Sequence, residues 1–352
     1  VRGAGGPVWS PDGKWIAFGS GGNPDDIAKQ GKPAVPGERE TDVRVINRAV
    51  YRADGGGYLD PTRPNHLWVI AAPANPGDRP TPKQLTSGQF NEGNFTWAKD
   101  SSKVYYATNR NPEPYYDEVP QTEIFSVSPS AGSPAFLTKI AMGVGAMTLS
   151  PDGSRVSFVA SASHRPVKSY TQPDLWVMEL AANAQPKNLT TAFDFDIGGG
   201  LTGDQAAPRA GGGNPPIWAQ DGRSIVVGFT KEGRQNLATV DAASGQLSDL
   251  TKGDHAVMSY RATNDRRKLV YLRSTPTRVG ELFVSDRDGS GVRQLTKLND
   301  ALFAKLNLTE PDDVWYTSFD GKKIQTWVQK PPDFDPNKKY PVILNIHGGP
   351  HA

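Results

Sequence analysis

One short stretch of the printed sequence combines residue types that could take part in chemistry. His347-Gly348-Gly349-Pro350 directly follows the apolar run at residues 341–346. Glycines at the end of a strand let backbone N–H groups approach a substrate carbonyl without a Cβ in the way, and such donors stabilise the oxyanion that forms in acyl transfer. We predict the N–H of Gly349 as the preferred donor, with that of Gly348 second. The alternative is a strand that simply ends in a Gly-Gly turn.

A second group of candidate residues lies in a long excursion of the chain at residues 21–65. Arg48, Tyr51 and Arg52 could bind a peptide terminus or an acyl group, because a guanidinium offers a planar fork to a carboxylate or carbonyl oxygen. Arginines are more often solvated or engaged in ion pairs. We favour that plain interpretation, and substrate binding by these three residues is the alternative.

The sequence indicates no cofactor and no metal site. His347 and His351 are separated by Gly-Gly-Pro, which prevents the helix that would bring both side chains to one ion. Residues 198–203 match the letters of a dinucleotide-binding motif, but no clear strand precedes them and prolines follow. Residues 286–289 look like the start of a calcium loop, yet the distal Glu is missing and a hairpin is expected there.

The elements that would position the candidate residues are built around a repeated turn. In Ser10-Pro11-Asp12-Gly13, proline presets φ for the first central position, aspartate suits the second, and glycine tolerates the left-handed conformation that follows. The pattern returns at residues 96–101, 148–153 and 217–222 and, more weakly, at 261–266. Each copy predicts a hairpin, so the chain is a repeat of small sheets.

A Leu-Thr pair closes each repeat, and its threonines are Thr86, Thr138, Thr190, Thr251 and Thr296. Successive threonines are 52, 52, 61 and 45 residues apart, and periods of about 40 to 50 residues with four short strands are typical of propeller blades. In the first repeat we expect strands at residues 7–10, 14–19, 66–71 and 83–86. The strands are apolar on both faces, which suits a sheet packed between two neighbours.

Two long connections interrupt the repeats, and a different pattern follows them. Residues 21–65, with a strand-like segment at 42–46, and residues 191–216 could lie on the outer rim or at the mouth of a central tunnel. After Thr296 the rhythm ends. We expect one separate hairpin at 312–328, a linker at 333–340 and a buried strand at 341–346.

Composition limits the classes of partner. Lys and Arg total 39 against 37 Asp and Glu, a net charge of +2, so nothing indicates nucleic acid or an anionic membrane surface. The 352 residues include no cysteine, which excludes disulfides and thiolate chemistry and leaves the compartment open. No apolar run is long enough to span a membrane. The first residues lack both an initiator Met and a signal-peptide core, so we expect that more chain precedes Val1.

Taken in order, these features resemble the prolyl oligopeptidase family of serine peptidases, and most closely its bacterial acylaminoacyl-peptidase branch. The order is Trp-Ser-Pro-Asp-Gly turns with Leu-Thr ends, a Phe-Asp-Gly hairpin, Lys-Pro-Pro and then His-Gly-Gly-Pro-His. Residues 330–351 carry the most specific part of the resemblance. Residues 48–68 also look like the corresponding blade of that branch.

The resemblance implies an all-β propeller joined to an α/β-hydrolase domain that holds a Ser-Asp-His triad. Residues 1–310 would be the propeller, with five blades visible where seven are expected, and residues 311–352 would begin the hydrolase domain. No G-x-S-x-G nucleophile elbow occurs in the sequence, and the family's triad follows the strand that ends at His347. The implied partners are a peptide substrate and the remaining catalytic domain, with homo-oligomers possible in principle.

The predicted function is therefore that of the substrate-gating propeller region of a serine peptidase that hydrolyses short or N-acylated peptides. The alternative is a non-catalytic binding propeller of the periplasmic interaction type, which would have no reason to continue into residues 312–352. A third interpretation keeps the hydrolase but changes its specificity to dipeptidyl peptidase, carboxypeptidase or esterase action. The residues present do not choose among these specificities.

Overall fold

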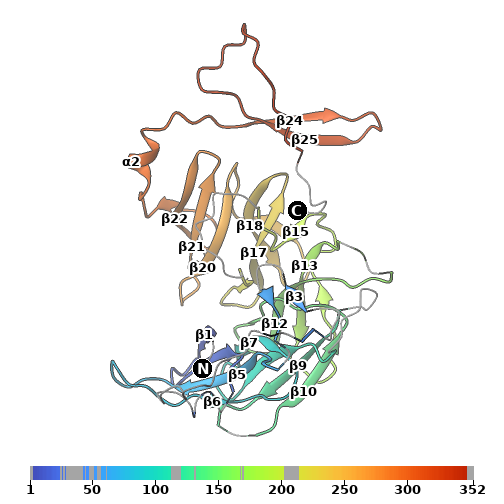
Figure 1. Ribbon diagram of the computed structural model, residues 1–352, viewed down its shortest axis with the longest axis vertical. Coiled ribbons are helices and arrows are strands. Elements are labelled where there is room, and N and C mark those ends of the chain that lie inside the picture. Colours follow the sequence, from blue (N-terminus) through green and yellow to red (C-terminus); the bar gives the residue numbers. More distant parts are fainter. Residues whose placement is uncertain are drawn as a thin grey trace. The chain divides into compact units, whose positions relative to one another are not determined.

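The computed structural model in Figure 1 is built almost entirely of β-strands. It describes residues 3–346 except 24–25, 27, 29–42, 44, 47–50, 54–56, 61, 112–119, 131, 167, 169 and 202–213. The chain divides into two compact units, residues 1–171 with 175–188 and residues 172–174 with 189–352. Each unit is described separately below, and the predicted boundary between residues 310 and 311 stays a prediction.

The first unit is built around three four-stranded antiparallel sheets. The first sheet has the order β1 (Gly5–Trp9), β2 (Trp15–Ser20), β5 (His66–Ala71) and β6 (Lys83–Gln84). The second contains β7 (Glu92–Trp97), β8 (Val104–Thr108), β9 (Thr122–Val127) and β10 (Ala135–Ile140). The third contains β11 (Thr148–Leu149), β12 (Arg155–Ser161), β13 (Pro173–Glu179) and β14 (Lys187–Asn188). A small separate hairpin is formed by β3 (Arg52–Ala53) and β4 (Gly57–Tyr58).

The second unit contains two further four-stranded modules, joined in one sheet by a single parallel pair between Gln235 and Ala256. The fourth module consists of β16 (Ile217–Trp218), β17 (Ser224–Lys231), β18 (Arg234–Asp241) and β19 (Leu247–Asp249). The fifth consists of β20 (Ala256–Ala262), β21 (Lys268–Thr275), β22 (Arg278–Asp286) and β23 (Arg293–Gln294). The short helix α2 (Asp300–Phe303) follows, and then the hairpin of β24 (Asp312–Thr317) and β25 (Lys323–Val328).

The prediction of five repeated sheet modules followed by one separate hairpin is confirmed. In the first module the four strands fall within two residues of their predicted positions at each end. The described strands do not form a closed ring, and the α/β-hydrolase part of the predicted fold is not formed by them. The expectation of seven blades stays a prediction.

A hydrogen-bond network explains why the repeated turn folds as it does. Ser10 Oγ donates to Asp12 Oδ1 at 2.6 Å and accepts from the Trp15 amide at 3.0 Å. The same aspartate oxygen accepts from the Lys14 amide at 3.1 Å, and Gly13 adopts φ +71°. The same bonds recur in the third and fifth modules, around Ser150 with Asp152 and around Thr263 with Asp265. The weakest sequence copy, at residues 261–266, is therefore a full structural copy.

Three modules depart from this turn, the second and fourth at the serine position and the second and fifth at the glycine position. Ala98 and Ala219 replace the turn serine, so only the aspartate bonds remain there. Ser101 and Arg266 occupy the left-handed position at φ +61° and +56°, where the other copies have glycine. A side chain at such a φ is strained, and the surrounding strands hold it in place.

The Leu-Thr pair ends a module by completing the ladder of its third strand. Leu250 N–H donates to the Leu237 carbonyl at 2.8 Å, and Thr251 Oγ1 accepts from the Leu237 amide at 2.9 Å. The hydroxyl then donates to Asn236 Oδ1 at 2.8 Å. In the same way, Thr296 Oγ1 accepts a hydrogen bond from the Leu282 amide and donates one to the Glu281 carboxylate. Thr138 is different, because a register shift in β10 lets its hydroxyl donate to the Ala184 carbonyl instead.

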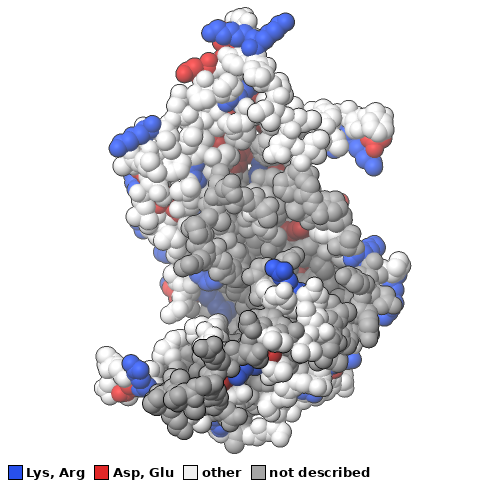
Figure 2. All heavy atoms as spheres, viewed as in Figure 1, with Lys and Arg blue, Asp and Glu red and all other residues white. Residues whose placement is uncertain are grey.

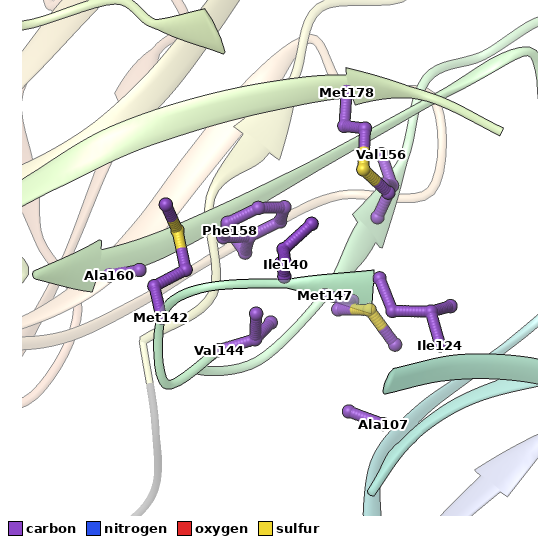
Figure 3. Close-up of a cluster of buried hydrophobic side chains, with 10 residues drawn as sticks. All are labelled: Ala107, Ile124, Ile140, Met142, Val144, Met147, Val156, Phe158, Ala160 and Met178. Carbon is purple, nitrogen blue, oxygen red and sulfur yellow. The ribbon is translucent and has the colours of Figure 1, made fainter. Parts of the chain in front are cut away.

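The cores are apolar on both faces of the strands, as expected. In β17 the consecutive residues Ile225, Val226 and Val227 are all buried. Figure 3 shows one buried cluster of the first unit, in which Phe158 from β12 lies beside Ile140 of the second module. Met178 from β13 and Ile124 of the second module belong to the same cluster. The two neighbouring sheets thus bury their facing sides against each other.

Two predicted strands are not found among the described residues. Val43, Val45 and Ile46 from the predicted strand at 42–46 are exposed and lie outside any strand. Residues 341–346 likewise form no strand, and Val342 and Ile343 are 89% and 94% exposed. An apolar run becomes a buried strand only when a neighbouring strand pairs with it, and the described residues supply none. The connection at 191–216 contributes an unpredicted strand, β15 (Asp196–Ile197), which pairs with β17.

Replacing Thr251 by Val should destabilise the second unit by about 1 to 3 kcal/mol, because the buried Leu237 N–H loses its acceptor. Thr251→Ser keeps the hydroxyl and is the matched control. Urea unfolding of both variants measures the effect. Equal midpoints for the valine and serine variants would contradict the role given to the hydroxyl.

The turn carboxylate of the third module should give a pH-dependent stability. The hydroxyl of Ser150 and the amide of Ser154 hold the pKa of Asp152 at about 2, below the ordinary aspartate value of 3.8. Its contribution is present above the unfolded-state pKa and is lost as the pH falls towards the folded-state value. We expect the urea midpoint of the wild type to approach that of Asp152→Asn between about pH 4 and 2. Asp194→Asn, an exposed carboxylate outside the turn, is the control and should not converge in this way.

Candidate functional site

The predicted oxyanion donors lie at the edge of what the structure describes. Gly348, Gly349 and the adjacent His347 are outside the described residues, and their roles stay predictions. The segment leading to them, residues 341–346, is described and carries exposed apolar side chains. The chain thus presents an uncovered apolar segment immediately before the motif.

The predicted substrate-binding group is only partly described. Arg48 lies outside the described residues. Arg52 lies in β3 with its guanidinium carbon 5.5 Å from the centre of the Tyr58 ring, and the rings of Tyr51 and Tyr58 are 6.2 Å apart. Tyr51 is 44% exposed. The hairpin therefore brings Tyr51 and Arg52 to one aromatic residue, and binding of a substrate by them stays a prediction.

The structure reveals a site that sequence reasoning missed, where the hairpin β24–β25 docks on the turn between β17 and β18 (Figure 1). Arg234 stands at its centre. Its Nη2 lies 2.8 Å from Asp313 Oδ2, and its Nε lies 2.5 Å from Asp254 Oδ1. The guanidinium also lies over the Trp327 ring, 5.4 Å from the ring centre. We call this group of four residues, Arg234, Asp254, Asp313 and Trp327, the hairpin anchor.

The charges of the anchor reinforce one another. Hydrogen bonds to Asp254 and then Asp313 raise the pKa of Arg234. The pKa of Asp313 is lowered by its hydrogen bond from Gln325 and by that from Arg234. Gln325 Nε2 donates both to Asp313 Oδ1 at 3.0 Å and to the Glu232 carbonyl at 3.1 Å. The Glu232-Gly233 pair between two apolar strands could have indicated the β17–β18 turn. No sequence pattern indicates that this turn contacts Asp313.

The two faces of the docked hairpin differ in chemistry. Asp313 pairs with Trp327 and Trp315 with Gln325 in the ladder, so their side chains share the face that meets the fourth module. The intervening positions form the opposite face, where Val314, Tyr316, Ile324 and Val328 are 37–51% exposed. The first face contacts the fourth module through Asp313, Gln325 and Trp327, although Trp315 and Trp327 remain 46% and 42% exposed. The opposite face carries the four partly exposed apolar side chains together with Asp312 and Thr326.

Further contacts tie down the chain on either side of the hairpin. Arg278 Nη1 lies 2.7 Å from Asp300 Oδ1, and Thr277 bonds to Glu310. Lys330 Nζ lies 2.5 Å from Asp312 Oδ2.

No cluster of three or more possible metal ligands occurs among the described residues. Residues 286–289 form the expected turn, with the Gly289 amide donating to the Asp286 carbonyl at 3.0 Å. In the part of the chain that is described, no helix is long and apolar enough to cross a bilayer. On the face shown in Figure 2, basic and acidic side chains are interspersed over the described surface.

Comparison with known proteins gives the chain its relatives. It is 24% identical over 355 residues to dipeptidyl-peptidase 5 of Porphyromonas gingivalis. The aligned region covers 97% of this chain and 47% of that protein. It is 24% identical over 349 residues to the uncharacterized peptidase YuxL of Bacillus subtilis, with 98% and 50% covered. The predicted resemblance to the prolyl oligopeptidase family is confirmed.

A solved structure agrees on the fold. The structure of an acylaminoacyl peptidase from Pyrococcus horikoshii superposes with a TM-score of 0.66 at 19% sequence identity. The match covers 97% of this chain and 45% of the Pyrococcus chain. No protein-family model matches the chain. The chain spans about half the length of the curated relatives it matches.

Proposed function

We propose that this chain is the substrate-gating propeller region, with the beginning of the α/β-hydrolase domain, of a serine peptidase that hydrolyses short or N-acylated peptides. The observation that carries the proposal is the set of partly exposed apolar side chains on the hairpin β24–β25, followed by the exposed apolar segment 341–346. A large contiguous patch of exposed apolar side chains usually marks a surface that packs against another molecule or domain. The relatives are about twice as long as this chain, which supports a catalytic domain as that surface.

In the proposed reaction a serine beyond residue 352 attacks the peptide carbonyl carbon, and a histidine takes its proton and passes it to the leaving amine. The N–H of Gly349, with that of Gly348 second, donates to the oxygen on which negative charge develops. The modules would restrict entry to short peptides and exclude bulk water, which strengthens these electrostatic contacts. Contact of Arg48, Tyr51 and Arg52 with a substrate terminus stays the alternative to their plain interpretation as solvated or ion-paired residues.

A second specificity is favoured by one comparison. The Porphyromonas gingivalis relative is a dipeptidyl-peptidase, and removal of dipeptides from a free N-terminus is compatible with the same reaction chemistry. Peptides with free and with acetylated N-termini, tested side by side on the longer protein, separate the two specificities. Faster cleavage of the acetylated peptides supports acylaminoacyl-peptidase action.

A fluorophosphonate probe tests the proposed location of the nucleophile. This chain alone should remain unlabelled, and the product of a gene that continues past Ala352 should be labelled at a downstream serine. Labelling of the isolated chain would contradict the proposal. A stop codon directly after Ala352 would favour the binding propeller instead.

Gly349→Ala in the longer protein tests the oxyanion loop. The added Cβ keeps the substrate carbonyl from the N–H donor, and loss of one such donor lowers kcat by about 10²- to 10³-fold. Gly143→Ala is the matched control, because φ there is not left-handed and a Cβ at that position meets no atom within 4 Å. Full activity of Gly349→Ala would remove this loop from the catalytic apparatus.

A further inference from the structure

We infer that Arg234 is a positioning residue that fixes the hairpin β24–β25, and with it the chain leading to His347, on the fourth module. Each of the three guanidinium nitrogens has a hydrogen-bond partner. Nε and Nη2 contact Asp254 and Asp313, and Nη1 donates to the Glu232 carbonyl at 2.8 Å. The catalytic consequence of this role rests on the proposed function, whereas the docking itself does not.

The anchor requires arginine rather than any cation. Two carboxylates from separate segments meet one planar fork, which a lysine ammonium cannot match as a rigid donor. The side chains of Arg234 and Asp313 are only 23% and 24% exposed, while that of Asp254 is 79% exposed. Asp254 therefore contacts the guanidinium from the solvent side and orients it. Asp313 accepts its hydrogen bond at the hairpin.

The turn beside Arg234 is shaped to receive the hairpin. Gly233 adopts φ +69°, and a Cβ at this position would lie 2.7 Å from Trp327 Cζ2. The glycine thus provides a flat surface for the indole, whose ring also lies under the guanidinium of Arg234. A side chain at residue 233 would move the hairpin away from the module.

The arrangement has a mechanical consequence. One face of the hairpin contacts the fourth module through the anchor, and among the described residues Val314, Tyr316 and Ile324 of the opposite face are 37–51% exposed. Partly buried charge pairs contribute more to orientation than to raw affinity. Arg234 should therefore control the placement of the hairpin without controlling the folding of the modules.

Hydrogen exchange followed by mass spectrometry tests this on the chain itself. In Arg234→Ala, amides of β24 and β25 should exchange about tenfold faster or more, since hydrogen bonds to charged groups contribute enough for such a factor. Amides of β8 and β12 should be unchanged. Arg234→Lys should restore the protection only in part. Arg278→Ala, which removes an exposed ion pair to Asp300, is the matched control and should have little effect.

Two outcomes would overturn the inference on the chain. One is unchanged exchange of the hairpin in Arg234→Ala. The other is equally accelerated exchange in the hairpin and in the module strands, which would show a general structural role. Gly233→Val provides an independent check and should accelerate the hairpin amides in the same way.

Kinetics of the longer protein test the catalytic consequence. Active sites are first counted with the fluorophosphonate probe, and kcat per labelled site should fall about tenfold in Arg234→Ala, an effect typical of small misplacements, with a smaller change in KM. A merely structural role would lower the number of sites and leave kcat per site unchanged, which would overturn the positioning role. If the wild-type longer protein is not labelled at all, the proposed function fails, while the exchange experiment still decides the docking.

Discussion

The structure depends on one interaction, the completion of a third strand by the Leu-Thr pair that follows it. In three of the described modules the leucine amide donates to the carbonyl of Leu67, Leu237 or Leu282, and the threonine hydroxyl accepts from the amide of that same residue. The hydroxyl thus replaces the next carbonyl of a β-ladder. A fourth strand of two or three residues can therefore end without leaving a buried N–H unpaired, and the chain is free to cross to the next module.

The threonine hydroxyl also needs an acceptor, and this draws polar side chains into the modules. Asn236 and Glu281 lie one residue before the leucine and accept from Thr251 and Thr296. Burial alone would raise the pKa of Glu281, but bonds from Thr296 and Asn299 outweigh it and the pKa is lowered. In this way the closure of the fifth module holds an ionised carboxylate that also fixes the start of α2. The modules become rigid supports on which connections of very different length can be carried.

The hairpin anchor uses that rigidity. Its arginine lies at the start of β18, a strand that pairs with β17 on one side and with β19 on the other. The backbone that carries the guanidinium is therefore held in place. Under the proposed function, this places the chain that enters the catalytic domain against a module of the gating region. The same residues would then link the entry of short peptides to the geometry of the oxyanion loop.

The sequence by itself predicted the modules and the resemblance to the peptidase family. Turn residues and Leu-Thr pairs act through bonds to residues close along the chain or in the same sheet, so their spacing predicts five modules and a separate hairpin. Only the tertiary structure decided the anchor, because Arg234 and Asp313 are 79 residues apart and no local pattern joins them. It also decided that Val43, Val45, Ile46 and residues 341–346 lie outside any strand, because a strand exists only where a partner supplies its hydrogen bonds. Apolar composition indicates that a segment could be buried, and the neighbouring chain decides whether it is.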